Sequence, residues 1–189
     1  MSLVIAKTRR GIKAIFRSLA PETQGFFSDL PDLIYSEFSL DIVLAYLFFR
    51  LEQGLNQTLY CGARKLLKTE ADLTRKALDI QFLTREKYLR FFQEIYGFPM
   101  DANIQGLMYD AEKIRDRVMH GKSVNDKERR RAISKVLAYC DRVNNFISAE
   151  QQLGFKPFCA DIRGFSGRLP SHDKATSRLI LKGIGLDLS

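Results

Sequence analysis

Apolar residues recur with a helical period along most of the chain, and no segment alternates convincingly with a period of two. Residues 3–19 carry one broad apolar stripe, which predicts an amphipathic helix. Residues 33–67 have a middle that is apolar on every side. This predicts one long helix or two at the centre of a bundle, with Gly54 and Gly62 as candidate bends. The stretch 21–32 is rich in Gly, Pro and Asp and is expected to form a loop.

Two shorter helices are predicted next from their start and stop signals. The first begins at Thr69 or Asp72 and reaches Phe82. The second is capped by Thr84 and ended by Gly97. The residues of the second helix that are expected to face the core are Tyr88, Phe91, Phe92 and Ile95.

Two longer helices follow. The first begins at Asp101 or Asn103 and ends at Gly121, because glycine readily adopts the left-handed backbone conformation. Asn125 and Glu128 have the spacing of a capping box and open the second helix. The expected core positions of the first are Ile104, Leu107, Met108, Ala111, Ile114 and Val118. Those of the second are Ile133, Val136, Leu137, Cys140, Val143, Phe146 and Ile147.

Glycine, proline and basic residues become frequent after Gly154. This change predicts a helical bundle over residues 1–154 and a basic arm over 155–189 that is extended apart from one short helix near 171–182. The residues expected to attach the arm to the bundle are Phe155, Phe158 and Phe165. The predicted fold class is all-α: a bundle of about five to seven helices with a basic C-terminal arm.

Composition is typical of a globular protein of the cytoplasm. Hydrophobic residues make up 46% of the chain and charged residues 28%. The longest apolar run, residues 42–49, is shorter than the roughly 18 residues that a membrane span needs. The N-terminal segment has charges within its apolar stretch, unlike a secretory signal. An odd number of cysteines without CxxC spacing indicates free thiols in a reducing compartment.

A formal net charge of +8 favours a polyanionic partner, of which nucleic acid is the commonest. The basic residues cluster in two stretches, 113–131 and 156–182. General surface charge without a specific partner is the alternative interpretation. The residues predicted to contact RNA are Arg117, Lys122, Arg129, Arg130, Arg168 and Arg178.

The segment IRDRVMHGK, residues 114–122, places an arginine, an acid and a histidine near the end of one predicted helix. Residues four apart share a helix face, so Asp116 is expected to accept a hydrogen bond from an imidazole nitrogen of His120 and to raise its basicity. Arg115 is about 140° around an ideal helix from His120. Its long side chain could reach the same spot where Gly121 loosens the helix end.

These residue types suit the cleavage of RNA. The Arg115 guanidinium could hold a phosphate and stabilise the extra negative charge of the transition state. His120 could exchange a proton with a ribose 2′-hydroxyl or with the leaving 5′-oxygen. This scheme needs no metal ion and no other cofactor. The alternative is that the segment is the charged end of an ordinary surface helix.

The pattern Arg115-Asp116-x-x-x-His120-Gly121 resembles the signature of the HEPN superfamily of ribonucleases, which are small helical bundles with an Arg-x(4–6)-His motif. The resemblance extends over about residues 33–154 in architecture, and only the short motif is specific. It implies that two motifs meet across a homodimer interface and form one metal-independent site with catalytic Arg115, Asp116 and His120. The implied product is a 2′,3′-cyclic phosphate. Some toxins of the superfamily carry, two residues after the histidine, a tyrosine that a partner antitoxin modifies, whereas this chain has Lys122 there.

The predicted function is therefore a homodimeric, metal-independent endoribonuclease that acts on RNA. The resemblance alone suggests a toxin–antitoxin or phage-defence setting, with an antitoxin or another regulatory protein as a further partner. Apolar residues beside the motif, such as Met108 and Met119, are expected at the dimer interface. The alternative is a catalytically silent helical module that binds nucleic acid or a protein.

Two other segments have weaker functional signals. His172 is expected to lie at the N-terminus of the last helix, where a structural role is the simpler interpretation. Residues 74–92 have the length of a helix-turn-helix, but their turn lacks a clear glycine and their aromatic residues fit a core.

Thiols and acidic residues add no stronger candidates. The three cysteines, which have no neighbouring histidine in the sequence, are Cys61, Cys140 and Cys159. The acidic residues expected to serve in loops and caps rather than as metal ligands are Asp29, Asp32 and Glu37.

Overall fold

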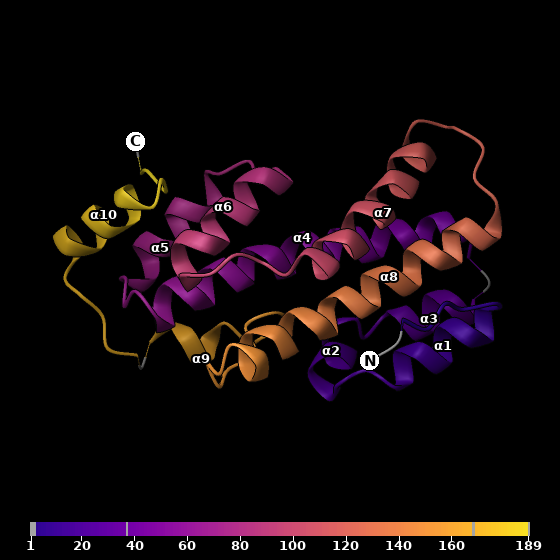
Figure 1. Ribbon diagram of the computed structural model, residues 1–189, viewed down its shortest axis with the longest axis horizontal. Helices are drawn as coiled ribbons and strands as arrows, with labels where there is room; N and C mark the ends of the chain where they lie inside the picture. Colours follow the sequence, from indigo (N-terminus) through magenta and orange to yellow (C-terminus); the bar gives the residue numbers. More distant parts are fainter. Residues whose placement is uncertain (1–2, 37, 168, 189) are drawn as a thin grey trace. The chain divides into compact units, whose positions relative to one another are not determined.

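The computed structural model describes residues 3–36, 38–167 and 169–188. These residues form ten α-helices and one π-helical turn, and they include no strand, which confirms the all-α fold class (Figure 1). Seven of the ten α-helices have nine residues or more, so the total is above the predicted five to seven. The excess comes from short helices in stretches that were expected to be loop or extended chain.

The chain clusters into two compact units that divide within helix α4. Unit 1 comprises Met1–Gln53 and Asp101–Lys156, and unit 2 comprises Gly54–Met100 and Pro157–Ser189. Residues 157–189 thus group with residues 54–100. The predicted division was different, with a bundle over residues 1–154 and an arm over 155–189. The helices are α1 Arg9–Arg17, α2 Pro21–Phe26, α3 Leu30–Tyr35, α4 Leu40–Lys65, α5 Ala71–Asp79, α6 Arg85–Tyr96, α7 Ala102–Met119, α8 Asp126–Asn145, α9 Arg163–Ser166 and α10 Lys174–Gly183. The π-helical turn Phe146–Glu150 follows α8.

Capping residues set the helix boundaries where the sequence predicts them. The Thr84 side chain accepts the Lys87 amide at the start of α6, and Gly97 ends that helix with a φ of +80°. Asn125 and Glu128 form the complete capping box of α8. The expected core positions of α6 and α8 are all buried. The signals at α6 and α8 are therefore confirmed.

The start predicted at Thr69 or Asp72 is wrong, because Glu70 caps α5, which ends at Asp79 rather than Phe82.

The N-terminal third of unit 1 differs from the prediction. Residues 3–6 are not helical, because the Ala6 amide donates to Ser134 Oγ (3.0 Å) and the Thr8 side chain caps α1 from outside. The stretch 21–32 was wrongly expected to be a loop. Pro21 occupies the first position of α2, where its missing N–H costs nothing, and Leu30–Asp32 form the first half of α3. Glu37 lies outside the described residues.

Neither Gly54 nor Gly62 interrupts α4, which is one continuous helix from Leu40 to Lys65. A Cβ atom at Gly54 would lie 2.3 Å from Phe158 Cζ, and one at Gly62 would lie 2.7 Å from Ile95 Cγ2. Both glycines therefore let other segments of unit 2 pack directly on the α4 backbone.

The C-terminal segment belongs to the core of unit 2. Phe158, Ser177, Leu181 and Leu186 are fully buried, and α10 packs on α5. The segment was predicted to have one helix, but it has two, α9 and α10. Among the expected attachment residues, only Phe158 is buried, whereas Phe155 and Phe165 are half-buried.

Buried Arg64, at the end of α4, holds this segment in place. Its side chain donates to the main-chain carbonyl oxygens of Phe165 (2.8 Å), Ser166 (3.2 Å), Leu169 (3.4 Å) and Thr69. Arg64 is only 2% exposed. Because one cation binds the main-chain oxygens of all three, Phe165, Ser166 and Leu169 are held against the end of α4.

No helix in the described part of the chain is long and apolar enough to cross a membrane.

Candidate active site

The last two turns of α7 carry the arginine, the acid and the histidine of the motif. Asp101 caps the start of α7, and Ile104, Leu107, Met108 and Ala111 are buried where the helix packs against α8 (Figure 1). The expected core residues further along, Ile114 and Val118, are only half-buried. Gly121, with a φ of +65°, ends the helix. The motif thus lies where α7 leaves the core of unit 1.

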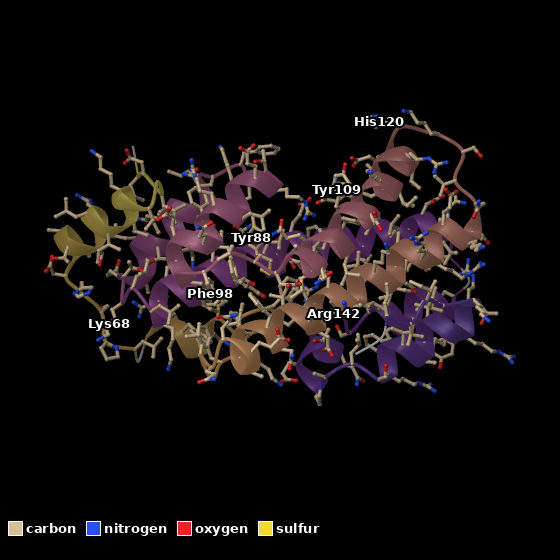
Figure 2. All side chains as sticks on the ribbon, viewed as in Figure 1. Lys68, Tyr88, Phe98, Tyr109, His120 and Arg142 are labelled. Carbon is tan, nitrogen blue, oxygen red and sulfur yellow. The ribbon has the colours of Figure 1, made fainter. Side chains whose placement is uncertain are left out.

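His120 is the last residue associated with α7 and is exposed. Its main-chain amide donates to the Asp116 carbonyl oxygen (3.0 Å). Within the described part of the chain, its imidazole has no hydrogen bond or ion pair. Figure 2 shows His120 at the tip of α7, beside the loop that leads to α8. Both ring nitrogens are therefore open to a ligand.

The Arg115 side chain contacts Asp116 on its own helix and two residues of α4. Its Nε and Nη2 both lie 2.8 Å from Asp116 Oδ1. Its guanidinium carbon lies 4.9 Å from the centroid of the Phe48 ring, and Nη1 lies 3.9 Å from Glu52 Oε1. The side chain remains 30% exposed. Phe48 and Glu52, more than 60 positions earlier in the sequence, thus set the position of this guanidinium.

The predicted hydrogen bond between Asp116 and His120 is wrong. The Asp116 carboxylate binds Arg115, since two N–H groups of a permanent cation compete better than one group of an imidazole. Helical spacing predicts correctly which residues share a face, but it does not predict which neighbour a carboxylate selects. In this arrangement Asp116 positions Arg115, and nothing among the described residues orients the His120 ring.

An open hollow of about 220 Å³ adjoins the Arg115 side chain. It is lined by Asp41, Leu44, Ala45, Phe48, Phe49, Glu52, Arg115, Val118 and Met119. Phe49 is 59% exposed and Met119 is 68% exposed. Met108, which was also expected at an interface, is buried and cannot contact a partner. The hollow is therefore an apolar surface with carboxylates and one guanidinium in its lining.

The predicted RNA contacts in unit 1 are largely engaged in ion pairs of their own. Arg117 Nη1 lies 2.7 Å from Glu128 Oε1, and Arg129 Nε lies 2.6 Å from Asp41 Oδ1. The hydrogen bond that Arg129 donates to Asp41 is the largest cause that raises the pKa of Arg129. Arg130 Nη1 is 3.9 Å from an oxygen of Asp126, and the side chain is 18% exposed. Arg117 and Arg129 thus connect α8 to other elements of unit 1, whereas the Arg130 pair lies within α8.

The other predicted RNA contacts differ from these three. Lys122 and Arg178 are exposed, and neither side chain has a carboxylate partner in the described part of the protein. Arg168 lies outside the described residues.

An ion pair that the sequence did not suggest joins α7 to α8, with its lysine buried and its aspartate partly exposed. Lys135, whose side chain is 7% exposed, donates to Asp110 Oδ2. This hydrogen bond is the largest cause that lowers the pKa of Asp110. The pair stabilises the α7–α8 contact that carries the motif. Its sequence signal is weak, because the two residues lie 25 positions apart on different helices.

The weaker candidates from the sequence have contacts, burial or positions that are typical of structural roles. The His172 amide donates to the Lys68 carbonyl oxygen (2.8 Å). In the segment 74–92, the aromatic residues of α6 are buried, so that helix does not present them to a DNA groove. Asp29 and Asp32 flank the start of α3.

The thiol and metal candidates can be judged from burial and clustering. Burial raises the pKa of the Cys61 thiol to about 12, which disfavours a thiolate nucleophile. Cys140 is buried as well, and Cys159 is half-buried. Among the described residues, no three His, Cys, Asp or Glu side chains lie close enough together to hold a metal ion.

Comparison with known proteins adds no family to this description. No protein-family model, no curated protein and no solved structure matches the chain.

Proposed function

We propose that the protein is a homodimeric endoribonuclease that cleaves RNA without a metal ion at a site built from Arg115 and His120. The observation that carries this proposal is the accessibility of both groups at one helix end: His120 is exposed without a side-chain partner, and Arg115 lines an open hollow. The sequence resemblance of the motif to the HEPN ribonucleases supports the same function.

The chemistry follows from the two side-chain types. Neutral His120 of one protomer takes the proton from a ribose 2′-hydroxyl as its oxygen attacks the adjacent phosphorus. The bond from phosphorus to the 5′-oxygen then breaks, and the protonated imidazole of the second protomer supplies the proton to that oxygen. The products are a 2′,3′-cyclic phosphate and a 5′-hydroxyl. The Arg115 guanidinium would stabilise the negative charge on the non-bridging oxygens.

Two protomers are proposed because one chain offers one histidine at the motif, whereas the reaction needs both a base and an acid. The hollow supports an isologous contact, since exposed Phe49 and Met119 lie beside Arg115. On dimerisation, a phosphate would compete with Asp116 for the Arg115 guanidinium.

A digest of RNA in EDTA tests the proposal. Wild type should cleave and leave 2′,3′-cyclic phosphate ends, whereas His120→Ala and Arg115→Ala should lose cleavage by roughly 100-fold or more. His172→Ala is the matched control, because it removes the other histidine and leaves the motif intact. Cleavage that vanishes in EDTA but survives both motif substitutions would contradict the proposal.

Sedimentation tests the assembly separately. A dimer at micromolar concentration that Met119→Asp converts to an inactive monomer would support the shared site. A fully active monomer would contradict it.

The second candidate is a catalytically silent helical module that binds nucleic acid or a protein. It is favoured by one observation, namely that the Arg115 guanidinium is already bound to Asp116 and approaches Glu52. Such a module should bind RNA equally well before and after His120→Ala and should never shorten it.

The biological setting rests on the resemblance alone. We propose a toxin or phage-defence effector that an antitoxin or another regulatory protein controls. Lys122 stands where some toxins of that superfamily have the modified tyrosine, so control by modification at that position is not proposed. Growth arrest on expression, which His120→Ala abolishes, would support the setting, and harmless expression of an active enzyme would oppose it.

A further inference from the structure

Helix α7 carries an exposed aromatic residue on the same side as His120. Tyr109 is 54% exposed, and Lys113 Nζ lies 4.1 Å from the centroid of its ring. Figure 2 labels Tyr109 and His120 on the same helix, with His120 at its end. Tyr109 does not line the hollow beside Arg115. It is therefore a feature separate from the proposed dimer contact.

Helix geometry relates Tyr109 to the motif. Eleven residues separate it from His120, which is close to three turns at 3.6 residues each, so the two side chains leave α7 on the same side. Asp116, seven residues from Tyr109, lies on this side as well. The opposite side is the buried one, with Leu107 and Ala111 packed in the core. At a rise of 1.5 Å per residue, the distance along the axis is about 16 Å.

An exposed aromatic ring with a cation beside it suits a nucleobase and its phosphate. Bases stack on aromatic side chains whatever their identity, because every base has a π face. Lys113 covers one face of the Tyr109 ring, yet more than half of the residue surface is open. A base could use the open face while the ammonium group remains near the adjoining phosphate.

We propose that Tyr109 and Lys113 form a nucleobase-stacking subsite for single-stranded RNA, a few nucleotides from the bond that is cut at His120. This proposal rests on the proposed ribonuclease function and specifies its substrate: an unpaired strand that lies along the exposed side of α7. Base-paired RNA would not enter this subsite, because its bases are already stacked within the helix.

A second lysine–tyrosine pair in unit 1 provides a matched control. Lys13 Nζ lies 3.0 Å from the centroid of the Tyr35 ring, and Tyr35 is 56% exposed. This pair has the same residue types and exposure but lies on α1 and α3, away from the motif helix. If any exposed tyrosine beside a lysine bound RNA, both pairs would contribute alike.

The test measures binding of a short, labelled, single-stranded RNA to the full chain carrying His120→Ala, so that cleavage does not interfere. A series of RNAs carries one abasic nucleotide, moved one position at a time. Adding Tyr109→Ala should weaken binding of the intact RNA roughly tenfold. In the protein that keeps Tyr109, removing the base at one position of the RNA should weaken binding by about the same factor. In Tyr109→Ala, removing that base should weaken binding no further. Tyr109→Phe should retain binding, because the ring is kept.

The control variants and a duplex complete the design. Tyr35→Ala should bind the single strand as tightly as the parent, and a duplex of the same length should bind independently of Tyr109. Tight single-strand binding by Tyr109→Ala would overturn the subsite. The subsite would also be contradicted if, at every abasic position, the loss of binding free energy simply added to the loss caused by Tyr109→Ala.

Cleavage by the otherwise unaltered chain separates this proposal from the enzyme itself. Suppose that cleavage depends on His120 but that Tyr109→Ala cleaves RNA and binds it as well as wild type does. This result would support the ribonuclease function and contradict the stacking subsite. Absence of both cleavage and RNA binding in wild type would overturn the ribonuclease, and the subsite with it.

Discussion

The two units differ in how many of their basic side chains pair with carboxylates. In unit 1, the basic side chains that pair with carboxylates of the same unit are Arg115, Arg117, Arg129, Arg130, Arg131, Lys135 and Lys156. In unit 2, the exposed basic side chains without a carboxylate within 4 Å, among the described residues, are Lys65, Lys68, Arg75, Lys76, Lys87, Arg90, Lys174, Arg178 and Lys182. Unit 1 has exposed cations of this kind as well, such as Lys122 and Lys127. Buried Arg64 binds carbonyl oxygens instead. Clustering of basic residues in a sequence therefore does not measure their availability to a polyanion.

The first prediction concerns the buried cation of unit 2 and has the largest expected effect. Arg64→Ala should lower the free energy of unfolding by about 3 kcal/mol or more, because the main-chain carbonyl groups of Thr69, Phe165 and Ser166 lose a charged donor that is itself buried. Chemical denaturation followed by circular dichroism measures it. Arg163→Ala is the control, since that side chain is 88% exposed and pairs only with nearby Asp161, and it should leave the unfolding midpoint unchanged. Equal midpoints for both variants would refute the role of Arg64.

The second prediction contrasts a tightly packed glycine of unit 2 with an open one of unit 1. Gly54→Ala should destabilise by about 1–3 kcal/mol, since the new methyl group meets the Phe158 ring. Gly106→Ala should stabilise by up to about 1 kcal/mol, because nothing lies within 4 Å of its Cβ position and alanine favours the helix. Thermal unfolding of both variants checks the opposite signs. A stabilising Gly54→Ala would mean that Phe158 moves aside freely.

The third prediction tests whether the unpaired cations of unit 2 contact RNA. Arg178→Glu with Lys182→Glu should weaken RNA binding severalfold at low salt and reduce the salt dependence, while the melting temperature stays the same. Arg129→Glu in unit 1 should instead lower the melting temperature, because it sets a carboxylate against Asp41. Unchanged affinity in the double variant would show that the free cations of unit 2 do not bind RNA.

The fourth prediction uses the low pKa of Asp110 in unit 1 and has the smallest effect. Lys135 favours the charged form of the Asp110 carboxylate. The contribution of this ion pair to stability is therefore present above the ordinary aspartate pKa of 3.8 and is lost as the pH falls below it. The contribution should be under about 1 kcal/mol, because Asp110 is 45% exposed. Unfolding of wild type and Asp110→Asn between pH 2 and about 6 should converge at low pH. Parallel curves would contradict it.

Local signals in the sequence predicted much of the fold. Caps act within one turn of the chain, so Thr84, Gly97 and the Asn125–Glu128 box could be recognised directly. The helical residues within 21–32 were missed because prolines that start helices look the same as prolines in loops. The C-terminal segment is held by Arg64, about a hundred positions earlier in the sequence. A contact over that distance leaves no periodic pattern from which it could be predicted.

The candidate site was predicted only in part for a related reason. The helix and its end at Gly121 follow from the sequence, as does the exposure of His120 near them. The partner of Asp116 does not follow, because the choice between Arg115 and His120 depends on competition between donors. The contribution of Phe48 depends on how α4 lies along α7, which only the fold provides.

The grip of Arg64 on the C-terminal segment has a consequence for how this region can change over time. Every acceptor that it uses near residues 165–169 is a main-chain oxygen, and a main-chain oxygen is present whatever side chain follows it. Substitutions among these residues therefore leave the joint intact, whereas an insertion or deletion shifts the oxygens out of reach. The amino-acid sequence of this segment can therefore change more readily than its length.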